Sequence, residues 1–443
     1  MRKTLILAIS LITLIAMTSL AGAQLSPEVA SWTEMIREKY EGTTITCAFC
    51  PHPATDAIQA MEDEFTQLTG IKVRWDIIEE GYLRNKLLIE HEAKTGVYDV
   101  LLIDAFNLAE YSPSGVALDL APFLQNSELT PEWFDWEDIL PAYREGIAQY
   151  QDTIYGVPVA GETRYVGYRE DLLEEYGKTP PETLDDFLNL AKFFNGKEEN
   201  LYGIAMRAQK GVHFGSGWMT LMYSLGAQFL DQQTWEVTVD HPNTIESLEY
   251  FVELLKQGPP DIAVYTHEEA VSAFASGRTA MWLDATALTP WIIDPTKSLI
   301  ADKVNFVPPP AGPAGAYGAL AGWNMGISSD SDKKEAAWAF IVWATSKYNA
   351  KTYVKNGGTP VRESVYQDPE LIEENWTFPI QLASLDRAYN LVKEGISWIP
   401  PHPNFMKVLE VVGDYGADVL TGRMTAEEAM REAQKEVEKI MAD

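Results

Sequence analysis

The alternation of apolar and polar positions predicts an α/β unit near the start of the chain. Short apolar runs at residues 44–49, 71–77 and 98–103 indicate buried strands, and the segments between them, 54–68 and 81–94, repeat apolar residues at the spacing of a helix face. Strands and helices in this order form a parallel sheet with right-handed crossovers. The three strands should therefore end at one edge of the sheet, where open α/β sheets bind their ligands.

A second α/β unit is predicted from Val166 onward. Its pattern indicates helices at residues 184–194, 218–229 and 244–256, and strands at 203–206 and 279–283. An apolar stretch at 320–327 and an amphipathic helix at 333–345 follow a loop rich in Pro and Gly. Two such units fit a chain of 443 residues, which is longer than a single core usually supports.

The chain crosses between the two units three times, at segments that carry Gly and Pro. We therefore expect an α/β fold of two discontinuous lobes joined by a three-segment hinge. The expected boundaries are 24–160 plus 308–358 for the N-terminal lobe, 163–304 plus 361–443 for the C-terminal lobe, and hinge segments near 160–163, 305–308 and 357–361.

The first 23 residues are typical of a cleavable signal peptide. Arg2 and Lys3 precede an uncharged apolar run, and Ala21, Gly22 and Ala23 form a small-x-small cleavage site. No cysteine lies near this site, so we expect no lipid anchor. The mature chain should be a periplasmic or secreted protein.

The formal net charge of −31 argues against binding to nucleic acid or to anionic lipid surfaces. The chain has no Gly-x4-Gly-Lys-Ser/Thr loop and is therefore not expected to hydrolyse ATP. We expect neither a cofactor nor a metal ion.

Cys47 and Cys50 are the only cysteines of the chain. Their spacing allows a local disulfide in an oxidising compartment or two unbridged thiols. A haem attachment motif needs His directly after the second Cys, where this chain has Pro51, and a zinc site needs a second ligand pair.

Asp284 directly follows the predicted strand at 279–283, between Trp282 and Thr286. At the carboxyl end of a strand it would face the ligand crevice of an open sheet, where a carboxylate accepts hydrogen bonds from hydroxyl groups. The alternative is a surface residue that caps a helix beginning at Thr286.

The order and spacing of several segments resemble those of family 1 extracellular solute-binding proteins of ABC importers. The resemblance covers essentially the whole mature chain and is carried by residues 98–124, 155–187, 273–287 and 333–347. The motifs ETRYVGYREDL, LYGIAMRAQKG, MWLDATAL and FIVWATSK are most similar to the branch that binds mannitol, sorbitol and related polyols, with sugars as the alternative. The resemblance implies a two-lobe, type II periplasmic-binding-protein fold, a monomer that closes over one polyol or small sugar, and delivery of the ligand to a membrane permease.

The resemblance also implies a binding site made of aromatic faces and of groups that grip hydroxyls. Matched by position, the candidate ligand-binding residues are His52, Asp104, Phe106, Glu162, Arg164, Trp218, Asp284, Trp323, Asn324 and Arg362. The first loop, residues 47–53, departs from the amide-rich loop of polyol-binding relatives, and this leaves the identity of the ligand open.

Each candidate also has a purely structural interpretation. Glu162 and Arg164 could be a surface pair on a linker, and His52 could sit at the rim of the cleft. Trp218 could be an ordinary core residue, as could Trp323 and its neighbour Asn324. Arg362 could form a salt bridge with Glu363 or Asp368.

A carbohydrate-active enzyme is the competing function. Asp104, Glu162 and Asp284 could converge, and glycoside hydrolases use two carboxylates that flank the scissile bond. Nothing in the sequence resembles a hydrolase motif, so binding without chemistry is the expected function.

Overall fold

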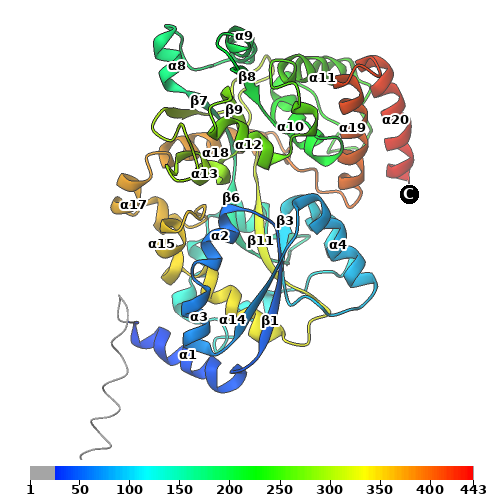
Figure 1. Ribbon diagram of the computed structural model, residues 1–443. Coiled ribbons are helices and arrows are strands. Elements are labelled where there is room, and N and C mark those ends of the chain that lie inside the picture. The colour runs from blue at the N-terminus through cyan, green and yellow to red at the C-terminus, as the bar shows by residue number, and fades with distance from the viewer. Residues whose placement is uncertain (1–24, 443) are drawn as a thin grey trace, which may run out of the picture.

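The computed structural model describes residues 25–442, which fold into two lobes (Figure 1). The predicted signal peptide lies outside the described residues. The first lobe contains a five-stranded sheet with the order β2 (Lys72–Ile77), β1 (Thr44–Phe49), β3 (Val100–Asp104), β11 (Ala321–Ile327) and β6 (Val157–Glu162). Strands β1, β2 and β3 are parallel, as the sequence predicts, whereas β11 runs antiparallel to both β3 and β6.

The second lobe contains a four-stranded sheet with the order β10 (Val304–Val307), β7 (Arg164–Arg169), β9 (Thr279–Ala285) and β8 (Tyr202–Ala205). Strands β8 and β9 are parallel, and β7 is antiparallel to β9 and β10. A short hairpin of β4 (Gln149–Tyr150) and β5 (Thr153–Ile154) completes the strands. The expected two-lobe α/β fold is confirmed.

Helices cover the faces of both sheets (Figure 1). Those of the first lobe are α1 (Pro27–Tyr40), α2 (Pro53–Gln59), α3 (Glu62–Thr69), α4 (Glu80–Glu92), α5 (Leu108–Ser114), α6 (Ala121–Leu124), α7 (Pro141–Gly146), α14 (Lys334–Thr345), α15 (Lys347–Lys355), α16 (Glu363–Tyr366) and α17 (Pro369–Glu374). Those of the second lobe are α8 (Glu170–Glu175), α9 (Leu184–Phe194), α10 (Val212–Met222), α11 (Pro242–Leu255), α12 (His267–Ala275), α13 (Thr289–Ile293), α18 (Phe378–Lys393), α19 (Phe405–Leu420) and α20 (Ala426–Ala442).

Two predicted helices differ from the structure in their bounds. The single helix expected at 54–68 is divided into α2 and α3, because the backbone turns at Ala60 and Met61. The helix expected at 218–229 begins earlier, as α10, directly after Gly211. The second difference places His213 and Ser216 on a helix.

The chain passes between the lobes at different points from those expected, apart from the first. Strand β6 ends at Glu162 and β7 begins at Arg164, so Thr163 is the first crossing. The second expected segment, 305–308, is wrong because β10 pairs with β7 and Ala311 bridges to Thr183, both within the second lobe.

The later crossings lie farther along the chain. Ala319 belongs to the second core and Leu320 packs against the first, so the second crossing is at 319–321. The third expected segment, 357–361, is also wrong, because Val361 and Phe378 remain in the first core, whereas Ile380 packs against the second. The lobes therefore consist of 25–162 plus 321–378 and of 164–319 plus 380–442.

Of the two possibilities that the sequence leaves open for the cysteines, the structure shows two unbridged thiols and not a disulfide. Cys47 lies in β1 and Cys50 directly follows this strand, and both are fully buried. Side chains alternate between the faces of an extended chain, so residues three apart point in opposite directions. Burial raises the pKa of both thiols well above the usual value, which makes them poor nucleophiles.

A search of residues 25–442 for a helix with the length and apolar character of a membrane span finds none.

Candidate functional site

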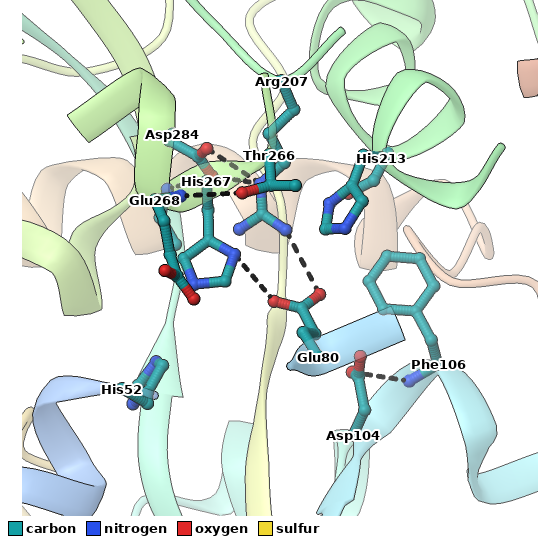
Figure 2. A network of polar contacts seen from close by, with 12 residues as sticks. His52, Glu80, Asp104, Phe106, Arg207, His213, Thr266, His267, Glu268 and Asp284 are labelled. Carbon is teal, nitrogen blue, oxygen red and sulfur yellow. Dashed lines mark hydrogen bonds and ion pairs between the residues drawn. The ribbon is translucent and has the colours of Figure 1, made fainter. Parts of the chain in front are cut away.

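A cavity of about 470 Å³, counted with the part that opens to solvent, lies between the two lobes. Its walls come from both lobes and are unusually rich in charged side chains (Figure 2). The lining residues are His52, Glu80, Arg84, Asp104, Phe106, Glu162, Arg164, Arg207, Val212, Ser216, His267, Ala285, Leu288, Ala321, Gly322 and Trp323.

The ends of the strands explain why these side chains meet. Asp104 ends β3 and Glu162 ends β6, and these strands run in the same direction because β11 is antiparallel to both. In the second sheet, Arg164 begins β7 opposite Ala285 near the end of β9, and Arg207 follows β8. The facing edges of the two sheets therefore bring residues from distant parts of the chain to one cleft.

Arg84 organises the wall of the first lobe. Its Nε donates to Asp104 Oδ2 at 3.0 Å, and its Nη2 donates to both Asp104 and Glu80. The remaining nitrogen, Nη1, has no hydrogen-bond partner among residues 25–442 although it is buried. A buried guanidinium N–H without a partner costs free energy, so it is a donor available to a ligand hydroxyl.

Arg207 organises the wall of the second lobe. Its Nε donates to both carboxylate oxygens of Asp284, at 2.9 and 2.8 Å, and its Nη1 lies 3.4 Å from Glu80 Oε1 across the cleft. Burial by itself would raise the pKa of Asp284, but the guanidiniums of Arg207 and Arg164 outweigh burial and lower it. Asp284 is thus an ionised residue that holds Arg207 in place.

This arrangement corrects both interpretations of Asp284. The residue is fully buried within β9, so it is not a surface cap for the following turn. Nor does it line the cavity, because Arg207 covers its carboxylate.

His52 and Glu162 form a buried pair in the cavity wall of the first lobe. His52 Nδ1 accepts a hydrogen bond from the backbone N–H of Ala54 at the start of α2, so its Nε2 carries a proton and donates to Glu162 Oε1 at 3.1 Å. This contact fixes the orientation of the Glu162 carboxylate next to the first crossing.

Arg164 is held on the opposite side of the cleft. It donates to Ser216 O at 2.8 Å and Ser216 Oγ at 2.6 Å, and also to Thr220. Its guanidinium lies over the ring of Trp398, 5.2 Å from the centroid. Burial lowers its pKa to about 10, so it stays charged at neutral pH.

Two aromatic side chains face the cavity. The Trp323 ring lies 6.0 Å from the His52 ring and 5.8 Å from Arg84 Cζ. Phe106 extends from the first lobe and packs edge-on against Trp398 of the second, with ring centroids 5.3 Å apart. Trp323 therefore offers the apolar surface on which the C–H groups of a ligand can rest.

Three residues that were expected to bind the ligand lie outside the cavity, so this expectation is wrong for them. Trp218 is a fully buried core residue whose Nε1 donates to Ser247 Oγ at 2.9 Å. The amide of Asn324 donates to Ile147 O at 2.7 Å, away from the cleft, because alternate residues of β11 face opposite sides. Arg362 stays in the first lobe and donates to Thr345 O and Asp135 O, with Asp138 as its acidic neighbour in place of Glu363 or Asp368.

Four charged lining residues were missed by the sequence analysis, namely Glu80, Arg84, Arg207 and His267. Arg207 follows a predicted strand in the same way as Asp284, so the rule of strand ends could have found it. Glu80 starts the helix after the second strand and could have been found similarly. Arg84 and His267 lie on helices, and no local pattern distinguishes them from surface residues.

Comparison with known proteins identifies the class. Residues 52–351 match the family model described as bacterial extracellular solute-binding protein, and the chain belongs to this family. It is 32% identical over 346 residues to the erythritol/L-threitol-binding protein of Mycolicibacterium smegmatis, covering 74% of this chain and 72% of that protein. It is 27% identical over 389 residues to the mannitol-binding protein of Pseudomonas aeruginosa, covering 84% of this chain and 86% of that protein.

Solved structures show the same architecture. A solute-binding protein of an ABC transporter from Agrobacterium radiobacter, in complex with ribitol, is similar with a TM-score of 0.84 and 26% identity, over 90% of this chain and 99% of that one. A solute-binding protein from Agrobacterium vitis with bound D-mannitol gives a TM-score of 0.82 and 28% identity, again over 90% and 99%. The chain is thus a solute-binding component of an ABC transporter and not a glycoside hydrolase.

Proposed function

We propose that this chain captures one small, uncharged polyol in the cleft and delivers it to the membrane permease of an ABC importer. The observation that carries this proposal is the set of matched charges in the cavity walls. Arg84 is paired with Asp104, and Arg207 with Asp284. The third guanidinium of the wall, Arg164, lies 3.9 Å from Asp284. Because all three guanidiniums have a carboxylate within ion-pair distance, the cavity does not require an anionic ligand.

The hydrogen-bonding capacity of the walls favours a ligand rich in hydroxyls. Paired carboxylates keep free lone pairs that accept from hydroxyl groups, and Arg84 Nη1 is a donor without a partner in the described chain. A linear polyol supplies both donors and acceptors along its length, and its C–H surface fits against Trp323.

The names of similar proteins agree with this choice, since two relatives are named for erythritol/L-threitol and mannitol. Similar structures hold ribitol and D-mannitol. We further propose that the chain is exported, is processed after residue 23, and acts as a monomer outside the cytoplasm.

Binding of polyols to the chain from residue 24 onward tests the proposal. Thermal-shift screening with erythritol, L-threitol, ribitol, D-mannitol, sorbitol, glucose and maltose should single out one or more polyols, and calorimetry should then give a stoichiometry of one. The Arg84→Gln variant should bind that polyol at least about tenfold more weakly, since it loses a buried donor. Arg423→Gln is the control, because Arg423 is an exposed residue on the second lobe. The absence of binding to every polyol would refute the assignment.

A further inference from the structure

Two histidines and a glutamate meet where three helices begin beside the cleft (Figure 2). Glu80 is the first residue of α4 in the first lobe. His267 is the first residue of α12, and His213 is the second residue of α10, both in the second lobe. The cluster therefore joins the two lobes.

Both imidazoles are buried and lack hydrogen bonds. His213 is 4% exposed and His267 is 1% exposed, and none of their ring nitrogens forms a hydrogen bond within residues 25–442. His267 Nδ1 lies 3.0 Å from Glu80 Oε2, but the contact lacks the geometry of a hydrogen bond. Two of the four nitrogens, His213 Nδ1 and His267 Nε2, have neither a hydrogen bond nor an ion-pair contact within residues 25–442. Buried imidazole nitrogens without partners are costly, so these two atoms in adjacent rings indicate a ligand.

The distribution of charge around the cluster favours a cation. Arg84 and Arg207 each have their own carboxylate, Asp104 and Asp284, and both approach Glu80 through Oε1. Oε2 is left facing His267. A second carboxylate, Glu79, places Oε1 at 3.5 Å from His213 Nε2. The cluster thus combines two imidazoles with two acidic groups, and Arg207, which Asp284 already pairs, reaches Glu80 beside it (Figure 2).

We propose that Glu80, His213 and His267 bind a divalent metal ion of the zinc class, and that the ion connects the two lobes. Two imidazoles and one carboxylate are a common ligand set for Zn²⁺, which leaves a fourth position for water or for Glu79. One ligand atom from each of the three residues lies within 4.8 Å of the others. A tetrahedral ion with bonds of about 2.1 Å holds its ligand atoms about 3.4 Å apart, so modest side-chain rotation completes the site.

The metal site exists only when the lobes are together, because its ligands come from both. A ligand that binds one conformation alone shifts the equilibrium toward that conformation. Zn²⁺ therefore closes the cleft without a polyol. These ligands are separated by more than 50 residues at each step and form no motif, so the sequence alone does not predict this site. The inference uses the two-lobe fold and is independent of which solute is transported.

The test is Zn²⁺ binding to the untagged mature chain after treatment with EDTA and dialysis. Calorimetry with ZnCl₂ should give one tightly bound ion, and Co²⁺ should give the absorption bands of a tetrahedral site. His213→Gln and His267→Gln should each weaken Zn²⁺ binding by at least about tenfold. His241→Gln is the matched control, since His241 is an exposed residue ahead of α11 and should not change the affinity.

Two further measurements keep the result interpretable. Thermal melting in EDTA should show that both variants fold, and small-angle scattering should show that Zn²⁺ compacts the wild type and not the variants. Equal Zn²⁺ binding by wild type and by the His213→Gln/His267→Gln double variant would overturn the proposal, as would no binding at all. Polyol screening in EDTA is a separate experiment, so either proposal can fail without the other.

Discussion

Replacement of Asp284 by Asn tests the inference that this carboxylate acts through Arg207. The change keeps the shape of the side chain and removes its charge. Arg207 then has only Glu80, at 3.4 Å and on the other lobe, as an acidic partner. The variant therefore leaves a guanidinium buried in the second lobe without a carboxylate of its own lobe.

The structure sets the size of the effect. Removal of one partner from a buried ion pair costs about 3–5 kcal/mol, and the remaining amide oxygen places Asp284→Asn near the lower end, at about 3 kcal/mol. We also expect polyol affinity to fall by about tenfold, because Arg207 loses the two contacts that orient it.

The matched control is Asp261→Asn in the same lobe. Asp261 pairs with Arg278 at 2.9 Å, but the side chains are 52% and 37% exposed. An exposed pair contributes only about 0–1 kcal/mol. Urea unfolding monitored by tryptophan fluorescence should therefore show that Asp284→Asn lowers the free energy of unfolding by at least twice as much as Asp261→Asn.

The pH dependence adds an independent check. The pKa of Asp284 is lowered in the folded chain, so the unfolded state binds its proton more readily. The contribution of ionised Asp284 to the free energy of unfolding is then complete above the pKa of about 3.9 that an aspartate has in the unfolded chain. This contribution is lost as the pH falls through the lowered pKa of the folded chain. The stability gap between wild type and Asp284→Asn should be constant from about pH 5 to 8 and narrow below about pH 4. Equal stability and equal polyol affinity at pH 7 would refute the role assigned to Asp284.

Three other predictions concern different parts of the molecule. Gly322→Ala should destabilise the first lobe and weaken polyol binding, because an added Cβ would lie 2.3 Å from the carbonyl oxygen of Ala160. The control is Gly177→Ala, at another positive φ with no atom within 4 Å, which should cost only about 1 kcal/mol of stability. Comparable losses of stability in the two variants would contradict this reasoning. Trp218→Phe should lower the melting temperature and leave polyol affinity unchanged, and Trp323→Ala should weaken binding measured by calorimetry. The two cysteines should react with a thiol reagent only after unfolding, without prior reduction, and a mass lower by two hydrogens would reveal a disulfide instead.

The sequence predicted those parts of the fold that depend on local pattern. Strand β1 and helix α9 have the expected bounds. A run of apolar residues marks the strand, and a capping box at Thr183 marks the start of the helix. The crossings were predicted less well. Turn residues at 357–361 mark a bend inside the first lobe, and the actual crossing depends on which core receives Phe378 and Ile380.

The candidate site shows the same distinction. The positions of Asp104 and Glu162 follow from the rule of strand ends, and both line the cavity. The rule locates a residue at the edge of a sheet but does not tell which group covers it, so Asp284 was expected to reach the ligand. Arg207, which covers it, follows strand β8 and lies 77 residues away in the sequence.

Several ion pairs of the cleft each join residues of one lobe, and this bears on what the lobes carry with them when they separate. Arg84 and Asp104 move together on the first lobe, as do His52 and Glu162, and Arg207 and Asp284 move together on the second. Separation of the lobes would expose these pairs to water without breaking them. It would break the contacts of Glu80 with Arg207 and His267, of Glu79 with His213, and of Asp56 with Lys297. An arriving solute meets walls whose donors and acceptors are already oriented, so little binding energy is consumed in rearranging charge.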